Sequence, residues 1–147
     1  MTTLTRFIFA ISLFLGTSLQ AMAEDNGDRF VLTLFTNAGQ IQGTAMTLAR
    51  TLAGEGHEVH ILLCGPAGEL AIADRMPETL EPRTITPREL MEEAMSAGAS
   101  VSVCPLFLPN TAFGRYSTDD FVDGVTEDSD AQMAERLADP NTKVLGF

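Results

Sequence analysis

Two cysteines are the residues of this sequence best placed to do chemistry. Cys104 ends the valine-containing run 99–103 and is followed by Pro105, which lacks a backbone N–H and cannot continue a central strand. Cys64 ends the apolar segment 58–64 in the same way. Ligands and reactive groups of open α/β sheets gather outside the carboxyl ends of the strands. Both thiols are therefore predicted at that edge.

Each cysteine has more than one interpretation. Cys104 could be a nucleophile or a carrier of persulfide sulfur, because the thiolate is the reactive form and a nearby cation such as Arg115 would lower its pKa. It could equally be a buried cysteine that packs as a small hydrophobe. Cys64 could resolve an oxidised Cys104, form a disulfide with it, or simply pack. Composition and spacing leave these alternatives open.

The turn 36–39 offers a second candidate site. Asn37 and Gly39 precede a predicted helix, whose first backbone N–H groups could hold an anion or a phosphate. The turn is neither a GxGxxG motif nor a P-loop, so a plain turn is the competing interpretation. A flavin bound here would need aromatic stacking partners, and the chain has no Trp and one Tyr. We expect no cofactor.

Metal binding is not indicated. The sequence has no CxxC motif, and His57 and His60 have no partner at ligand spacing, so packing or solvent contact is the expected role of both. The carboxylates of segment 119–123 lack the glycine-centred spacing of a calcium loop. We predict no metal site.

The first 23 residues have the pattern of a secretory signal peptide. A short segment ending in Arg6 precedes the apolar stretch 7–19, and Ala21-Met22-Ala23 fits the small-x-small cleavage pattern. The apolar stretch is too short to span a bilayer, which needs about 20 residues. We therefore expect cleavage after Ala23, a single domain over 24–147, and a periplasmic location without a membrane anchor.

The charge of the chain argues against two classes of partner. Twenty acidic residues against nine basic ones give a formal net charge of −11. Such a surface repels phosphate backbones and anionic lipid headgroups. Binding to nucleic acid or to a membrane is therefore not expected.

Hydrophobic periodicity predicts an alternating α/β chain. Strands are expected at 29–35, 58–64, 99–103 and 143–147, and helices at 41–52, 86–98 and 130–138, the last with Met133, Ala134 and Leu137 facing inward. Segment 76–85, with two prolines, is expected to be a surface loop, and 118–125 a capped helical turn. This order predicts a mostly parallel sheet covered on both faces.

These residues resemble the DsrE/DsrF-like (YchN-like) sulfur-relay family. The resemblance lies in four segments, which are 30–52, 56–63, 98–104, and 119–125 followed by 143–147. It implies a three-layer α/β/α fold with a mainly parallel five-stranded sheet. Since periodicity identifies four strands, the fifth is expected near 76–85. The resemblance also implies small homo-oligomers, often trimers or hexamers.

The resemblance further implies a function. In active members the cysteine that matches Cys104 accepts sulfur as a persulfide and passes it on. We therefore expect a periplasmic sulfur carrier or sulfurtransferase, whose partner is a sulfur donor or acceptor protein or a small compound such as thiosulfate or polysulfide. The alternative is a non-catalytic periplasmic binding or assembly module with the same fold.

Overall fold

The computed structural model describes residues 27–147, so the predicted signal peptide and its cleavage site lie outside the described residues. The strands are β1 (Arg29–Leu34), β2 (Glu58–Leu63), β3 (Ser100–Val103), β4 (Val125–Glu127) and β5 (Thr142–Gly146). The α-helices are α1 (Gly39–Gly54), α2 (Pro87–Ser96) and α3 (Asp130–Ala138). Short 3₁₀ helices are η1 (Gly65–Ala71), η2 (Leu108–Asn110), η3 (Ala112–Gly114) and η4 (Thr118–Asp120).

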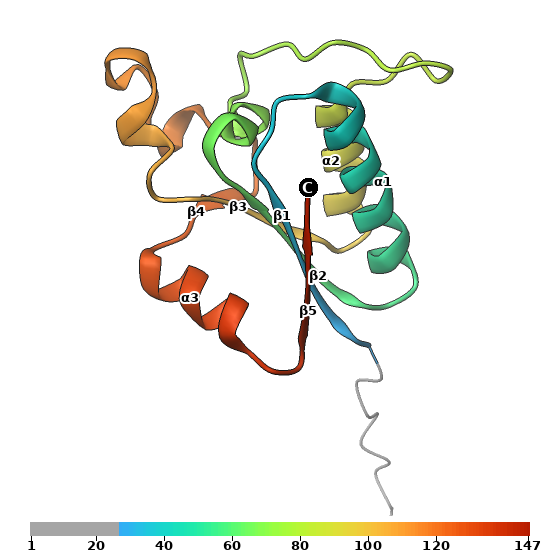
Figure 1. Cartoon of the computed structure of the whole chain (residues 1–147). Helices are drawn as coiled ribbons and strands as arrows, with labels where there is room; N and C mark the ends of the chain where they lie inside the picture. Colours follow the sequence, from blue (N-terminus) through green and yellow to red (C-terminus); the bar gives the residue numbers. More distant parts are fainter. Residues whose placement is uncertain (1–26) are drawn as a thin grey trace, which may run out of the picture.

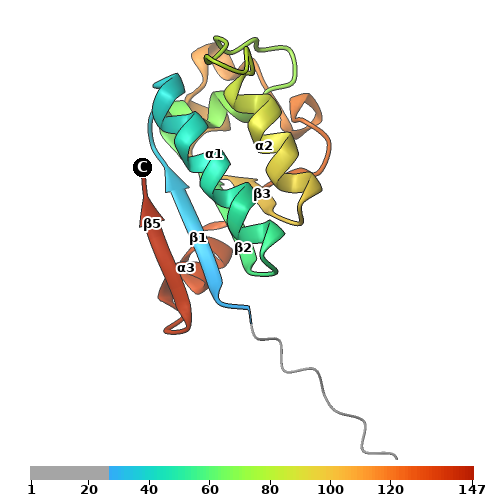
Figure 2. The ribbon, with the colours of Figure 1, turned by 90° about the vertical axis from the view of Figure 1, so that its right-hand side faces the viewer.

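The five strands form one sheet in the order β4-β3-β2-β1-β5, and every pairing is parallel. Helices α1 and α2 lie on one face and α3 on the other, as Figures 1 and 2 show. The predicted three-layer α/β/α fold is therefore confirmed. Because all strands run the same way, the segments that follow β1, β2 and β3 meet at one edge of the sheet.

The main core lies between the sheet and the pair α1–α2. Alternate residues of the central strands point to this face, and Leu32, Ile61 and Val103 are almost completely buried there. Met46 of α1 and Met91 of α2 pack against them. Each such side chain contributes about 1.5–3 kcal/mol to the free energy of unfolding when fully buried. This layer is the rigid base on which the strand ends are held.

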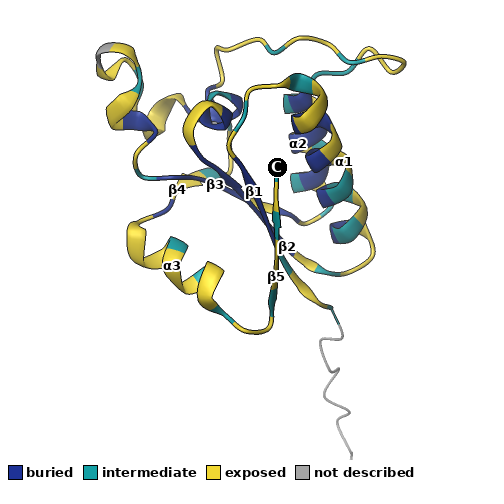
Figure 3. Cartoon of the chain, viewed as in Figure 1, coloured by how far each residue is buried: buried dark blue, intermediate teal, exposed yellow. Residues whose placement is uncertain are grey.

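The opposite face is covered more thinly. Val31, Leu62 and the two cysteines form a small cluster beneath Met133 of α3. The predicted inward orientation of Ala134 and Leu137 is wrong, because both side chains are exposed, and α3 has no fully buried residue. Figure 3 shows how exposed α3 is beside α1 and α2. A single short helix cannot bury a whole apolar stripe against five strands.

The position predicted for the fifth strand is also wrong. Segment 76–85 forms no strand and contains only an isolated antiparallel bridge between Leu80 and Ile85. The fifth strand is β4, which pairs with β3 at an edge of the sheet. It has only three residues, Val-Thr-Glu, directly after Gly124 in a left-handed conformation (φ +84°). Three residues with one apolar side chain carry no measurable alternation, so periodicity could not detect the strand.

Capping boxes begin both later helices. Thr86 caps α2 by accepting from the backbone N–H of Glu89, whose carboxylate accepts the Thr86 N–H in return. Ser129 and Gln132 make the same reciprocal pair at α3. Such caps satisfy backbone N–H groups that the helix leaves free. The Ser129 cap fixes the start of α3 at Asp130, three residues after the last residue of β4.

The irregular segment 105–122 is held against η1 by close packing and by backbone hydrogen bonds. Gly68 of η1 lies under the ring of Phe107, and a Cβ atom at Gly68 would come within 2.4 Å of that ring. The N–H of Ala73 donates to Asp120 and that of Val122 to Ala71, at 2.9 and 2.7 Å. The segments that follow β2 and β3 are therefore packed against each other and joined by backbone hydrogen bonds.

No helix among residues 27–147 is both long and apolar enough to cross a membrane.

The contact between Gly68 and Phe107 generates a first prediction. Gly68→Ala should destabilise the protein by about 1–3 kcal/mol, because the added methyl group must displace an aromatic ring in a packed site. Gly54→Ala is the matched control, since a Cβ atom there has nothing within 4 Å. Chemical denaturation measures both. Equal stability of the two variants would contradict the described packing.

Candidate functional site

The two cysteines lie next to each other where β2 and β3 end. The parallel register pairs Leu63 with Val103, and the next residue in each chain segment is a cysteine. Their Cα atoms are 4.9 Å apart, and a disulfide joins Cys64 to Cys104. The sequence left three roles open for Cys64, and the structure shows the one in which it forms a disulfide with Cys104. The register of two neighbouring strands is its direct cause.

The disulfide is shielded from solvent on the α3 side of the sheet. Cys64 is 9% exposed and Cys104 is 6% exposed. The Sδ atom of Met133 lies 3.6 Å from the Sγ atom of Cys104. The Cys64 N–H donates to Leu34 and the Cys104 N–H to Leu63, so these two amides are already used in the sheet. Helix α3 therefore covers the sulfur atom of Cys104 with Met133.

A buried polar network lies beside the cysteines under α3. The imidazole of His60 contacts the Ser100 hydroxyl through Nδ1 at 2.7 Å and the Ser102 hydroxyl through Nε2 at 2.8 Å. Because a hydroxyl both donates and accepts, either tautomer of the ring is satisfied. Asp128, only 2% exposed, has an oxygen 3.8 Å from His60 Nε2 and accepts a hydrogen bond from Arg136 of α3 at 3.1 Å.

Burial holds His60 in its neutral form. Loss of hydration, together with the positive charge of Arg136 and against the opposing effect of Asp128 and Glu58, lowers the pKa of His60 to about 4. At neutral pH the contact with Asp128 is therefore not an ion pair. The ion pair of this network is Arg136–Asp128, which fastens α3 to the end of β4. Sequence reasoning expected only packing or solvent contact for His60, and it missed Asp128 and Arg136.

The three other predicted site residues lie near the same edge of the sheet but not at the sulfur atoms. Arg115 and Asn37 line a cavity of about 520 Å³, together with Gly65 and Leu106, which closely follow the cysteines. Gly39 starts α1 and lines an adjoining cavity of about 370 Å³ that also includes Asn37. The structure thus brings Arg115 and Asn37 together. The cysteine side chains do not line either cavity.

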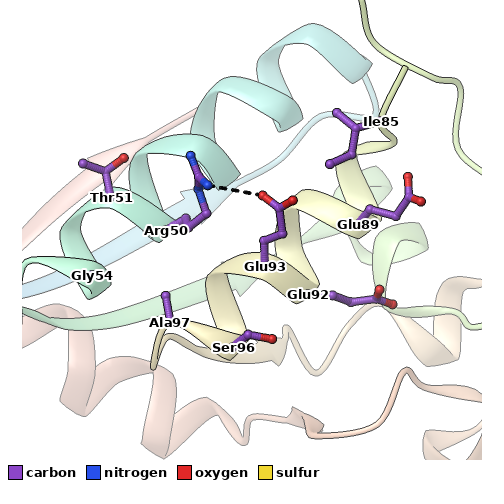
Figure 4. Close-up of a pocket in the computed structure, with 9 residues that line it drawn as sticks. All are labelled: Arg50, Thr51, Gly54, Ile85, Glu89, Glu92, Glu93, Ser96 and Ala97. Carbon is purple, nitrogen blue, oxygen red and sulfur yellow. Dashed lines mark ion pairs between the residues drawn. The ribbon is translucent and has the colours of Figure 1, made fainter. Parts of the chain in front are cut away.

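Another hollow lies between α1 and α2, away from the carboxyl ends of the strands. Figure 4 shows Arg50 of α1 directed toward Glu93 of α2, with Glu89 and Glu92 beside it. The Arg50–Glu93 ion pair is 3.5 Å long, and Arg83 also holds Glu93. This open groove is acidic, and its Arg50–Glu93 ion pair joins α1 to α2. Among residues 27–147, no group of three or more His, Cys, Asp or Glu side chains is arranged to hold a metal ion.

Comparison of the chain with protein-family models and with curated proteins finds no match. The family resemblance described above therefore rests on the residues of this chain alone.

The burial of neutral His60 predicts a pH dependence of stability. An unfolded chain holds the imidazole at its ordinary pKa near 6.5, whereas the folded pKa is about 4. Between these values the unfolded state binds a proton that the folded state does not, so stability is complete above pH 6.5 and falls as the pH drops toward 4. The loss is up to about 3 kcal/mol.

His60→Gln tests this effect because glutamine can bond the serines without titrating. Urea unfolding of the wild type and of this variant at about pH 7 and about pH 4.5 should give a smaller pH effect in the variant. His57→Gln is the control, since His57 lies outside the network and accepts from the Asp28 N–H. An identical pH effect in wild type and His60→Gln would rule out the assignment.

Proposed function

We propose that this protein is an exported sulfur carrier or sulfurtransferase, located in the periplasm, in which Cys104 accepts sulfane sulfur as a persulfide. Cys64 is the resolving thiol, and the Cys64–Cys104 disulfide is the oxidised state of the same site. The observation that carries this proposal is the pairing of the two cysteines at neighbouring strand ends. Cys104 is assigned as the acceptor because the family resemblance places the sulfur-bearing cysteine there.

Loading starts from the reduced site. The thiolate of Cys104 attacks the sulfane sulfur of thiosulfate, and a new S–S bond forms as the S–S bond of thiosulfate breaks. Sulfite leaves with the bonding electron pair, and a persulfide anion remains on Cys104. No net oxidation of the protein occurs, because one sulfur–sulfur bond replaces another. A polysulfide reacts in the same way, with a shorter polysulfide as the leaving group.

Unloading has two routes that start from the persulfide. The thiolate of an acceptor attacks the outer sulfur atom, which returns the Cys104 thiolate. Alternatively, the Cys64 thiolate attacks the Cys104 sulfur, the bond to the outer sulfur breaks, and that sulfur leaves as hydrosulfide after taking one proton from water. The second route produces the disulfide. An external dithiol must then reduce it with two electrons and two protons before the next cycle.

The surroundings of the site support this chemistry in two ways. The disulfide lies where ligands of parallel α/β sheets usually bind, and the sulfur atoms are covered mainly by Met133, a flexible side chain on the thinly packed α3. A shielded persulfide is protected from reaction with solvent oxidants, while movement of one side chain admits a small donor.

The loading reaction can be followed by mass spectrometry. Protein that has been reduced with a dithiol, freed of reductant and exposed to thiosulfate or polysulfide should carry one added sulfur atom on the Cys104 peptide. Cys104→Ser should abolish this loading. Cys64→Ser should accumulate more persulfide than the wild type, because the thiol that releases hydrosulfide is missing. Equal loading of Cys104→Ser and wild type would refute the assignment of Cys104.

A second candidate function is a non-catalytic assembly module, and exposed apolar side chains favour it. Leu106 is 73% exposed on the wall of the cavity. Val144, the register partner of Val31, is 46% exposed on edge strand β5, although parallel sheets are normally covered on both faces. Both positions would suit a homo-oligomer, such as the trimer or hexamer that the family resemblance implies, or another protein partner.

Light scattering after size exclusion tests this second function. An assembly module should form the same oligomer as wild type when Cys64 and Cys104 are both replaced by serine, and it should fail to take up sulfur. Leu106→Ser and Val144→Ser should each weaken the oligomer if their surfaces form the contact, whereas Met76→Ser, which alters a fully exposed loop residue, should not. A monomer at all concentrations would contradict a homo-oligomeric assembly.

A further inference from the structure

The cavity at the carboxyl end of the sheet is formed by three separate connections. Asn37 comes from the segment after β1, Pro66 from the segment after β2, and seven lining residues, among them Leu106, Phe107 and Arg115, from the segment after β3. Its volume of about 520 Å³ is within the range of small-molecule sites. Ligands of parallel sheets bind outside the carboxyl ends of the strands, which is where this cavity lies.

Arg115 gives this cavity a distinctive charge. Of the eight Lys and Arg residues in the part of the chain that the structure describes, seven bind a carboxylate or backbone carbonyls. Arg115 alone has no such partner within that part. In a chain of net charge −11, carboxylates are abundant, and yet the exposed Arg115 lines the cavity without an ion-pair partner. A guanidinium left in this position can pair with an anionic ligand.

The other lining groups define the shape of that ligand. Arg75 also lines the cavity, but its charge is balanced by Glu69 at 2.7 Å. Asn37 and Tyr116 add polar groups that can hydrogen-bond to a head group. Leu106 and Phe107 supply an apolar wall. One unbalanced cation beside an apolar wall fits a singly charged head group attached to an apolar body better than it fits a compact inorganic ion.

The cavity walls are held in place before any ligand arrives. The Thr36 side chain accepts from the Ala38 N–H at 3.1 Å, and Gln42 donates to the Thr36 carbonyl at 2.9 Å, which fixes the turn carrying Asn37. Phe107 is pressed against Gly68, which fixes the apolar wall. A preformed site binds without the cost of ordering a loop.

We infer that this cavity is a binding site for a small organic monoanion, a carboxylate or sulfonate with an apolar body, whose head group pairs with Arg115. The apolar body lies against Leu106 and Phe107. This binding requires neither cysteine and is independent of the proposed sulfur chemistry. It assigns Arg115 a role in recognising a ligand rather than in lowering the pKa of a thiol.

Benzenesulfonate and benzoate are suitable probes, and the Cys64→Ser/Cys104→Ser double variant can be compared with the wild type. Titration into the ¹⁵N-labelled protein should shift the amide signals of 36–38, 65–69 and 106–116 in a saturable way. Arg115→Gln should weaken binding about tenfold or more, since a charge-assisted pair is lost. Arg83→Gln is the matched control, because Arg83 pairs with Glu93 on α2. It should bind like the wild type.

Three results would overturn the inference. They are the absence of saturable shifts at these amides, equal affinity of Arg115→Gln and wild type, and equally tight binding of neutral benzenesulfonamide. Because the double serine variant cannot carry sulfur, binding to it separates this inference from the proposed function. Loss of sulfur loading with intact binding would refute the chemistry alone, and the reverse result would refute the anion site alone.

Discussion

Parallel pairing of β2 with β3 is the constraint on which the rest of this structure depends. It aligns Leu63 with Val103, and consequently brings Cys64 and Cys104 together although 40 residues separate them in sequence. In the chain-entropy account, closing a loop of that length stabilises the folded state by roughly 4 kcal/mol. The same pairing places the segments that follow the two strands side by side. A disulfide on one face and a cavity at the edge therefore share one structural origin.

The two faces of the sheet differ in how much apolar surface they bury. Helices α1 and α2 bury the main core, which makes the strand ends rigid. Helix α3 buries little and is fastened by the Arg136–Asp128 ion pair, by the Ser129 cap and by the contact of Met133 with Cys104. Elements with few buried apolar contacts open more easily than core elements. The thin cover is thus on the face where the sulfur atoms of the disulfide lie, next to a buried histidine that stays neutral.

Most of the architecture could be predicted from the sequence, because long apolar strands and capped helices leave strong local signals. Thr86 with Glu89 marked the start of α2, and the run before Pro105 marked the end of β3. β4 escaped prediction because its three residues are specified by pairing with β3 rather than by their own pattern. The network of His60, Asp128 and Arg136 joins three elements, and only the fold shows that these residues meet. The one signal in the sequence was the position of His60 in a strand between apolar residues, which indicates a buried imidazole that needs hydrogen-bond partners.

The most direct test of this account is the redox equilibrium of the two cysteines in the folded protein. The protein is equilibrated in a series of dithiol–disulfide buffers, the free thiols are trapped by alkylation, and intact mass gives the fraction in each state. We expect one reversible two-electron transition between a protein with two free thiols and one with an intramolecular disulfide, with the fold retained on both sides. Cysteines that stay alkylatable under oxidising buffers, or a disulfide that opens only on unfolding, would contradict it.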